Sequence, residues 1–266
     1  MNKIKQKLQS LQGPALNIYF TAGFPRLNLT GPIIRSLVEN GVDLIEVGMP
    51  YSDPMADGPT IQYSSSVALR EGMTLDLMFE QVYSIASQSI VNQYKVPILL
   101  MGYLNQIMQY GEEKFLQSCN RVGISGLIVP DLPPELYEEQ YQSLFAAYGI
   151  EIIFLITPQT TEKRIRKIDD LSNSFIYMVS DSSITGQTQK ISDAQLAYFQ
   201  RIQKMNLRNP TLIGFGISDH ESYRQAARFS AGAIVGSAFI KKLMDMDNDD
   251  QLDRVVKSFV HDIRNG

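Results

Sequence analysis

The chain has 266 residues, of which 24 are Lys or Arg and 28 are Asp or Glu, giving a formal net charge of −4. This mildly acidic balance argues against a nucleic-acid or membrane-surface role. The one cysteine, Cys119, cannot form an internal disulfide, which favours a reducing environment. The longest apolar stretch, residues 96–104, is too short to span a bilayer, and the first residues lack the apolar core of a signal peptide. We therefore expect a cytoplasmic protein.

The first twelve residues are predicted to form a short helix, because Ile4, Leu8 and Leu11 recur on one helical face. After this helix, short apolar runs alternate with amphipathic helical patterns along the rest of the chain. The predicted strands are residues 16–21, 44–48, 97–101, 126–130, 152–156, 175–179, 211–215 and 233–235. Their apolar character is continuous rather than alternating, which is typical of parallel strands covered on both faces.

Eight such strands with helices between them predict an α/β fold, a (β/α)8 TIM barrel that forms a single domain over residues 1–266. The alternative is a doubly wound open sheet, but no G-x-G-x-x-G motif follows the first strand. Two connections are long for a barrel. The connection after the second strand has room for an extra helix at about residues 61–70. The connection after the sixth strand, residues 180–190, has the composition of a mobile lid.

Two carboxylates, Glu46 and Asp57, lie on a stiff segment at the end of the second strand. Residues 46–59 contain three prolines and two glycines, and such a backbone can hold two titratable groups still and apart. The alternative interpretation is a surface turn with two solvated acids. Their position at a strand's carboxyl end favours a functional role, so we predict that this pair performs acid/base chemistry.

Glycines follow the seventh and eighth predicted strands, at Gly216 and at Gly236, and Ser237 comes next at a predicted helix start. In barrels the loops after these two strands frequently bind phosphate through backbone N–H groups and a helix N-terminus. A third glycine, in Thr185-Gly186 of the lid, could close over the same anion. Tight turns also need glycine, so each position alone is weak evidence; together they predict a phosphate site.

A metal site is not expected. The two histidines, His220 and His261, fall on predicted helices, and no Cys/His cluster has zinc-like spacing. Asp131 ends the fourth strand, where it could make a polar contact, although a helix N-terminal cap or a turn is the simpler interpretation. Tyr103 and Asn105 follow the third strand at the same rim, and they either contact a ligand or brace neighbouring loops.

Together these segments resemble the family of tryptophan synthase alpha subunits, over essentially the whole chain. The most specific match is the block of residues 45–62, and supporting matches lie at residues 20–23, 101–105, 129–133, 214–218 and 236–238. The resemblance implies a barrel that splits indole-3-glycerol phosphate into indole and glyceraldehyde 3-phosphate. It also implies a beta-subunit partner, in an alpha2-beta2 heterotetramer, that carries pyridoxal phosphate and receives the indole, with no cofactor on this chain.

The resemblance assigns roles residue by residue. Glu46 matches the general acid/base, and Asp57 matches the carboxylate that binds the indole N–H and offsets positive charge on the ring. The other matched positions are Tyr177 and Thr185 beside the substrate, Gly186, Gly216, Gly236 and Ser237 around the phosphate, Tyr19, Ile61, Leu100 and Leu127 as apolar walls, and Pro50 and Asp53 on the partner-facing surface. For Leu100 and Leu127, a place in the ordinary barrel core fits the sequence equally well.

One segment departs from the family pattern. The family lid usually reads Ser-Arg-x-Gly-Val-Thr-Gly, whereas this chain has Asp181 in place of the arginine and Ser183 in place of the first glycine. Two other functions remain open from the sequence. One is a different phosphate-binding barrel, such as a sugar-phosphate isomerase or epimerase, and the other is a barrel that mainly binds and activates a partner.

Overall fold

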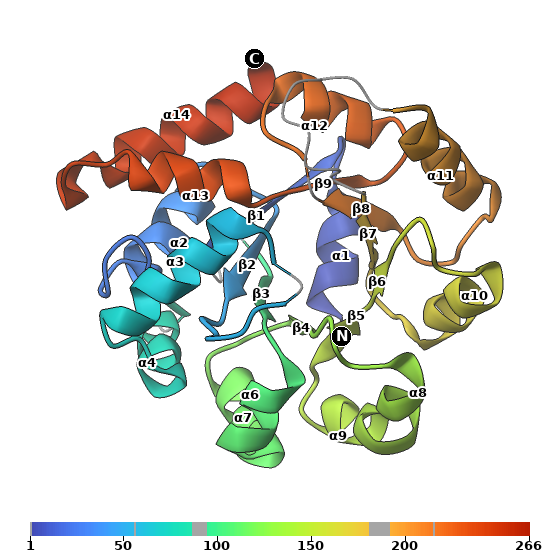
Figure 1. Ribbon diagram of the computed structural model, residues 1–266, viewed down its shortest axis with the longest axis horizontal. Coiled ribbons are helices and arrows are strands. Elements are labelled where there is room, and N and C mark those ends of the chain that lie inside the picture. The colour runs from blue at the N-terminus through green and yellow to red at the C-terminus, as the bar shows by residue number, and fades with distance from the viewer. Residues whose placement is uncertain (1, 56, 87–94, 181–191, 215) are drawn as a thin grey trace.

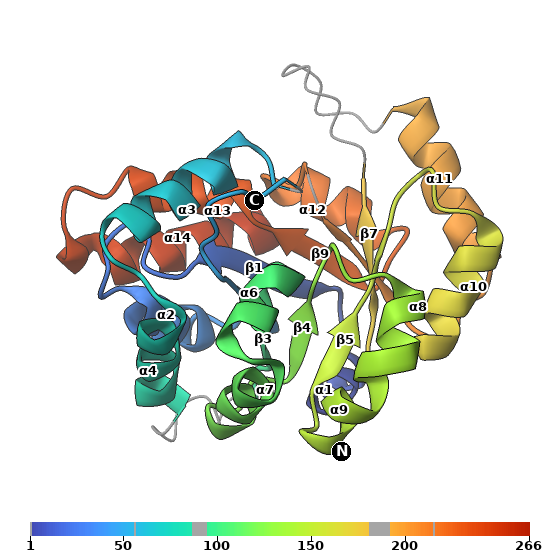
Figure 2. The same ribbon diagram turned by 60° about the horizontal axis from the view of Figure 1, so that its bottom comes forward.

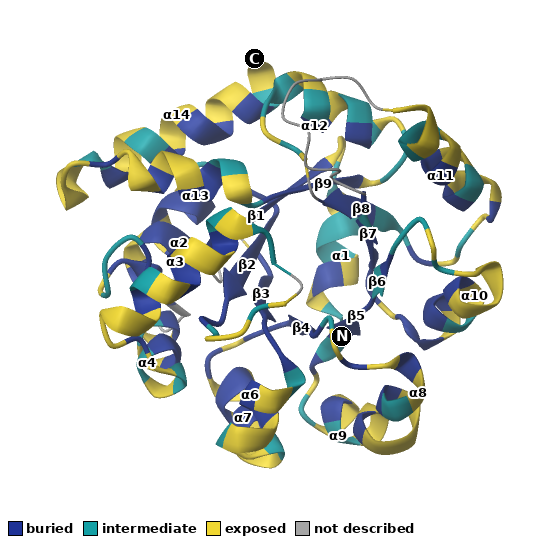
Figure 3. Ribbon diagram, viewed as in Figure 1, coloured by how far each residue is buried: buried dark blue, intermediate teal, exposed yellow. Residues whose placement is uncertain are grey.

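The computed structural model describes residues 2–55, 57–86, 95–180, 192–214 and 216–266. Within these residues nine parallel strands form one sheet, and helices surround it (Figure 1). The strands are β1 (Ala15–Thr21), β2 (Leu44–Gly48), β3 (Ile98–Met101), β4 (Gly126–Ile128), β5 (Glu151–Ile153), β6 (Leu155–Ile156), β7 (Ile176–Val179), β8 (Thr211–Gly214) and β9 (Gly232–Val235). The strands are buried almost throughout, whereas the helices expose their outer faces (Figure 3).

The strand predicted at residues 152–156 closes the sheet into a barrel. The order of the strands is β5-β4-β3-β2-β1-β9-β8-β7-β6, and only Phe154 separates β5 from β6 in the chain. The first half pairs with β4 and the second with β7, and the Tyr177 N–H donates to the carbonyl of Phe154 at 2.9 Å. The predicted barrel is therefore confirmed, with its fifth strand bent in two. The doubly wound alternative is wrong, because β5 and β6 join the two ends of this sheet, whereas a doubly wound sheet is open.

The helices follow the strands as the amphipathic patterns predicted. They are α1 (Lys3–Ser10), α2 (Thr30–Glu39), α3 (Pro59–Arg70), α4 (Leu75–Ala86), α6 (Leu104–Tyr110), α7 (Glu112–Arg121), α8 (Pro134–Leu136), η1 (Tyr137–Tyr141), α9 (Gln142–Ala147), α10 (Glu162–Leu171), α11 (Asp193–Lys204), α12 (His220–Ala227), α13 (Ser237–Met244), η2 (Asp249–Gln251) and α14 (Leu252–Asn265). The predicted extra helix is α3, which begins at Pro59 because proline suits the first helical position. No helix in the described ranges is long and apolar enough to cross a membrane.

Helix α1 covers the end of the barrel at which the strands begin (Figure 2). Its N-cap is Asn2, whose Oδ1 accepts a hydrogen bond from the Lys5 N–H at 2.9 Å. Ile4 is fully buried and belongs to the same apolar cluster as the interior side chains of the strands. The predicted N-terminal helix is confirmed, and it leaves the opposite end of the barrel, where the strands terminate, to the long loops.

Side chains of the barrel divide into two apolar layers. Alternate residues of a strand face the interior of the barrel, and the others pack against the helices. In β1, for example, Ala15 and Tyr19 belong to the interior cluster, whereas Leu16, Ile18 and Phe20 belong to the cluster that contains the helix residues. Two buried layers explain why the strands read as continuous apolar runs in the sequence.

Candidate active site

Glu46 lies inside the barrel, on β2, and is fully buried. One oxygen, Oε1, accepts a hydrogen bond from Nδ2 of Asn17 on β1 at 2.5 Å. The other oxygen, Oε2, is buried and has no hydrogen-bond partner among the described residues. Burial raises the pKa of Glu46 to about 8, and the hydrogen bond from Asn17 opposes this shift. A carboxyl group with such a pKa can both give and take a proton near neutral pH.

Asp57 lies on the loop between β2 and α3 and is partly buried. Its Oδ2 accepts a hydrogen bond from the Tyr103 hydroxyl at 3.1 Å, while Oδ1 is buried without a partner in the described part of the chain. The side chain of Gln62, one turn into α3, donates to the Asp57 carbonyl at 2.9 Å and fixes the backbone of the loop. Burial raises the pKa of Asp57 to about 6, against the effect of the Tyr103 hydrogen bond.

Two tyrosines share the enclosed space with these carboxylates. Tyr19 and Tyr177 are both buried in the interior cluster. The pKa of Tyr19 is raised chiefly by burial and then by the charge of Asp57, and that of Tyr177 chiefly by burial and then by the charge of Glu46. Groups that perturb one another in this way lie near each other. The structure thus brings together four side chains that are far apart in the sequence.

The apolar walls differ in part from the sequence prediction. Tyr19, Ile61 and Tyr177 do belong to the interior cluster. Leu100 and Leu127 instead belong to the outer cluster, which packs the strands against the helices, so their predicted place beside the substrate is wrong.

The interior positions next to these two leucines are Met101 and Ile128, which are opposite each other in the register of β3 and β4. Since side chains alternate along a strand, a shift of one residue changes the face. We did not predict Met101 or Ile128, because both faces of a buried parallel strand are apolar.

Asn17 is a further interior residue that the sequence patterns did not indicate. It is fully buried, and it lies in a predicted strand whose other members are almost all apolar. A polar residue inside such a strand must find a partner. This signal was present in the sequence, but the identity of the partner depends on how β1 and β2 pair.

The predicted phosphate residues lie on neighbouring loops. Strand β8 pairs with β9, so the loops that hold Gly216 and Gly236 leave the barrel side by side. Gly216 has φ +77°, a conformation that favours glycine. Ser237 begins α13 and is exposed, with Gly236 as the N-cap. The predicted contacts of Thr185 and Gly186, like the departures at Asp181 and Ser183, lie outside the described residues.

The rim residues after β3 and β4 connect Asp57 to the surface. Asp131 lies in a turn, and its two oxygens accept hydrogen bonds from the Leu104 N–H at the start of α6, at 3.0 and 3.2 Å. It is not the N-cap of the helix that follows it, because Pro133 has that position in α8. The ring of Tyr103, which binds Asp57, stacks on Tyr51 with 5.0 Å between centroids. Nδ2 of Asn105 in turn donates to the Tyr51 hydroxyl at 3.1 Å.

The loop between the two carboxylates also forms one wall of a surface groove of about 440 Å³, which Tyr51 and Ser52 line together with residues of α6. Of the two residues predicted to face a partner, Pro50 is buried and contributes only to the groove wall, whereas Asp53 is exposed. Met55, on the same loop, exposes 93% of its surface.

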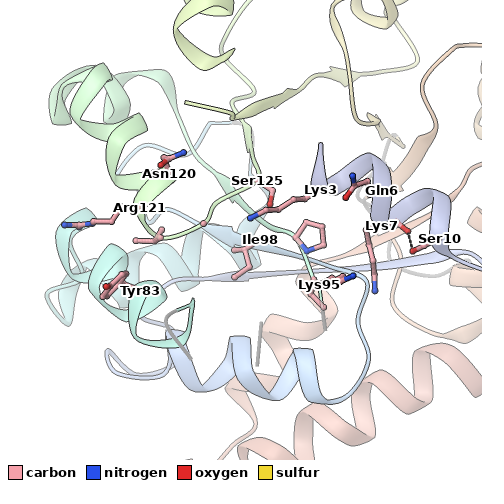
Figure 4. A pocket seen from close by; sticks show the side chains of 14 residues that line it. Lys3, Gln6, Lys7, Ser10, Tyr83, Lys95, Ile98, Asn120, Arg121 and Ser125 are labelled. Atoms are coloured by element: carbon pink, nitrogen blue, oxygen red, sulfur yellow. Dashed lines mark hydrogen bonds between the residues drawn. The ribbon is translucent and has the colours of Figure 1, made fainter. Parts of the chain in front are cut away.

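A cavity of about 650 Å³ lies between α1 and the beginnings of β3 and β4 (Figure 4). Lys3, Lys7 and Lys95 line it with Ser125. It is at the N-terminal end of the strands, which in barrels serves stability rather than catalysis. Among the described residues, no group of three or more His, Cys, Asp or Glu side chains is arranged to hold a metal ion.

Comparison with known proteins gives a consistent result. Residues 5–265 match the family model described as tryptophan synthase alpha chain. The tryptophan synthase alpha chain of Flavobacterium johnsoniae is 49% identical over 264 residues, which cover 99% of this chain and 100% of that protein.

Solved structures agree with the sequence comparison. The tryptophan synthase alpha chain of Legionella pneumophila superposes with a TM-score of 0.86 at 30% identity, covering 99% of this chain and 96% of that one. A chain of the tryptophan synthase complex from Pyrococcus furiosus gives a TM-score of 0.81 at 31% identity, covering 94% and 97%.

Proposed function

The chain belongs to the tryptophan synthase alpha chain family, and on that premise we propose that Glu46 and Asp57 are the catalytic pair of its reaction. The protein is a lyase of tryptophan biosynthesis, which cleaves indole-3-glycerol phosphate to indole and glyceraldehyde 3-phosphate by a retro-aldol reaction. The observation that carries the proposal is the buried Glu46 with a free oxygen, whose charge acts on the same two buried tyrosines as that of Asp57.

The reaction needs two proton transfers at one carbon–carbon bond. The ring carbon of indole must gain a proton, and the hydroxyl on the adjacent glycerol carbon must lose one, so that the bond between them breaks and an aldehyde forms. We assign both transfers to Oε2 of Glu46, which as a carboxylate first takes the hydroxyl proton and then gives that proton to the ring carbon. A carboxyl group with a pKa of about 8 exists in both forms near neutral pH. Asp57, with a pKa of about 6, is ionised under the same conditions. Its negative charge stabilises the cationic ring that forms on protonation.

Substrate binding divides between an apolar and an anionic part. Tyr19, Ile61 and Tyr177, with Met101 and Ile128, supply interior apolar surface for the indole ring. The phosphate is assigned to Gly216, Gly236 and Ser237, where α13 begins and its first N–H groups are available to an anion. Thr185 and Gly186 are assigned to the same substrate by the family pattern alone.

The alpha chain works with a beta subunit, since its structural relatives come from tryptophan synthase complexes. We propose an alpha2-beta2 heterotetramer in the cytoplasm, with pyridoxal phosphate on the beta subunit and no cofactor required by this chain. The groove beside Tyr51, with the exposed Met55 and Asp53, is the surface we assign to that partner.

The test is the release of indole from indole-3-glycerol phosphate by the purified chain, with and without a beta subunit. Glu46→Gln keeps the shape of the side chain but cannot exchange protons, and we expect a loss of about 10²-fold or more in kcat. Asp57→Asn should also lose rate, because an amide does not neutralise the ring cation. Glu39→Gln changes an exposed carboxyl on α2 and serves as the control.

If Glu46→Gln keeps the parent rate, the assignment of the acid/base is wrong. If the parent chain releases no indole alone but activates a beta subunit, the alternative of a partner-activating barrel is supported instead.

A further inference from the structure

The contact between Asn17 and Glu46 makes the two oxygens of the Glu46 carboxyl group inequivalent. Nδ2 of Asn17 donates a hydrogen bond to Oε1 of Glu46 at 2.5 Å. Oε2 has no hydrogen-bond partner among the described residues, and neither has Oδ1 of Asn17. Both side chains are fully buried, so bulk water does not satisfy these atoms. The amide therefore restrains one carboxyl oxygen and leaves the other available.

The pairing of β1 with β2 explains how this contact arises. The two strands are parallel, with Asn17 opposite Leu44 and Tyr19 opposite Glu46. Asn17 and Tyr19 are two residues apart and face the same interior as Glu46. The Asn17 amide therefore reaches Glu46 diagonally, from a position nearer the N-terminal ends of the strands than Tyr19. It contacts the carboxyl group from the side opposite to the open end of the barrel, where the substrate must enter.

We propose that Asn17 is a positioning residue for Glu46, which holds Oε1 so that Oε2 is the oxygen that exchanges protons with the substrate. This inference rests on the proposed role of Glu46. It adds a specific residue and a specific oxygen to that role, neither of which follows from the acid pair itself.

The charges around Glu46 show why this amide matters for the protonation state. Asp57 carries the same charge as an ionised Glu46, and Tyr19 and Tyr177 are neutral because burial and the nearby carboxylates raise the pKa of each. None of these three groups favours the ionised carboxylate. A hydrogen bond from an N–H to the carboxylate does favour it, and Asn17 supplies the one such contact recorded for Glu46 in the described residues.

Two substitutions separate the positioning role from a purely structural one. Asn17→Leu keeps the branched shape of the side chain but removes the donor. Asn17→Asp keeps the shape and places a second carboxyl group against Glu46, so that the two share a proton. The measurement is kcat/KM for indole-3-glycerol phosphate from pH 6 to pH 10, which reports the pKa of the essential base in the free enzyme.

In the parent we expect the rate to rise with pH to a plateau above about 8, the pKa of Glu46. In both variants this rise should move upwards by about one pH unit or more. The rate at pH 7 then falls by about tenfold for each unit of pKa shift, while the rate at high pH recovers towards the parent value. Ile18→Val is the control, because it alters a buried side chain of the same strand in the outer cluster.

A loss of rate that is equal at every pH would overturn the proposal, because misfolding or a displaced strand is not repaired by alkali. An unshifted profile at the parent rate would overturn it as well. Circular dichroism and thermal unfolding of each variant establish that it is folded, and if Asn17→Leu does not fold, Asn17→Asp decides alone. Glu46→Gln distinguishes a failure of this proposal from a failure of the proposed function. If the Glu46→Gln variant is active, Glu46 is not the acid/base, whatever Asn17 does.

Discussion

The hydroxyl group of Tyr19 occupies the space into which a side chain at residue 48 would project. A Cβ atom added to Gly48 would lie 2.1 Å from Oη of Tyr19, well inside the van der Waals distance. Gly214 and Tyr177 have the same relationship, with 2.2 Å between the added Cβ and the hydroxyl oxygen. Two strands thus carry glycine at interior positions so that the two tyrosines fit beside the carboxylates. These glycines are required for space, not for backbone conformation.

Gly48→Ala is therefore expected to displace the Tyr19 ring and disturb the site from within. We expect a loss of indole release of about tenfold or more and a lower midpoint of thermal unfolding, because overpacking of a core usually costs about 1–3 kcal/mol. The control is Gly13→Ala, since nothing lies within 4 Å of a Cβ at Gly13. Equal activity of the two variants would mean that Tyr19 can move without consequence for the reaction.

The raised pKa of Glu46 predicts that stability depends on pH in a particular direction. In the folded chain the pKa of Glu46 is about 8, so its carboxyl group stays protonated up to about that pH, whereas the ordinary pKa of a glutamate is 4.5. Between these values the folded state binds more protons than the unfolded state, so the free energy of unfolding falls as pH rises.

Glu46→Gln removes this titration, so the variant should not lose stability at high pH as the parent does. Asp57 has a pKa of about 6, so a comparison at pH 6.5 and pH 9 is nearly free of its contribution. We expect the variant to gain stability relative to the parent between these two values, by about 1.4 kcal/mol for each pKa unit crossed. Urea unfolding at both pH values measures this. A relative stability that does not change with pH would show that Glu46 ionises without cost.

The phosphate site can be tested at Gly236 with two substitutions of different charge. Gly236→Asp brings a carboxylate to the proposed anion site, and inhibition by glycerol phosphate should weaken by about tenfold or more. Gly236→Ala adds only a Cβ, which would lie 3.3 Å from the Tyr19 ring, and it measures the steric effect alone. If both variants bind glycerol phosphate equally well, the phosphate does not lie at the loops after β8 and β9.

The two faces of β3 should respond differently to truncation. Leu100→Ala removes a fully buried side chain of the outer cluster, and we expect it to cost about 2–5 kcal/mol of stability with little change in KM. Met101→Ala removes interior surface beside the proposed indole site, and it should raise KM by about tenfold, the equivalent of one buried apolar side chain. Steady-state kinetics and urea unfolding of both variants measure the two effects. The reverse pattern would mean that Leu100 faces the substrate after all.

The amino-acid sequence determined the architecture, and it pointed to the two acids that we propose as the catalytic pair. The repeated order of apolar strand and amphipathic helix is a local property, and it predicted each barrel strand to within two residues in the described ranges. Glu46 and Asp57 could be predicted as candidates because their segment is stiff, carries two acids and follows a strand. The extra helix α3 was predictable from the length of the connection and from Pro59.

Only the tertiary structure decided which side chains meet in the interior. Leu100 and Met101 are equally apolar neighbours, and a strand buried on both faces gives no alternation from which to assign them. The contact of Asn17 with Glu46 depends on the pairing of two strands that are 29 residues apart at these positions. Local patterns fix the strands, whereas register and closure of the sheet, which are properties of the whole chain, fix the site.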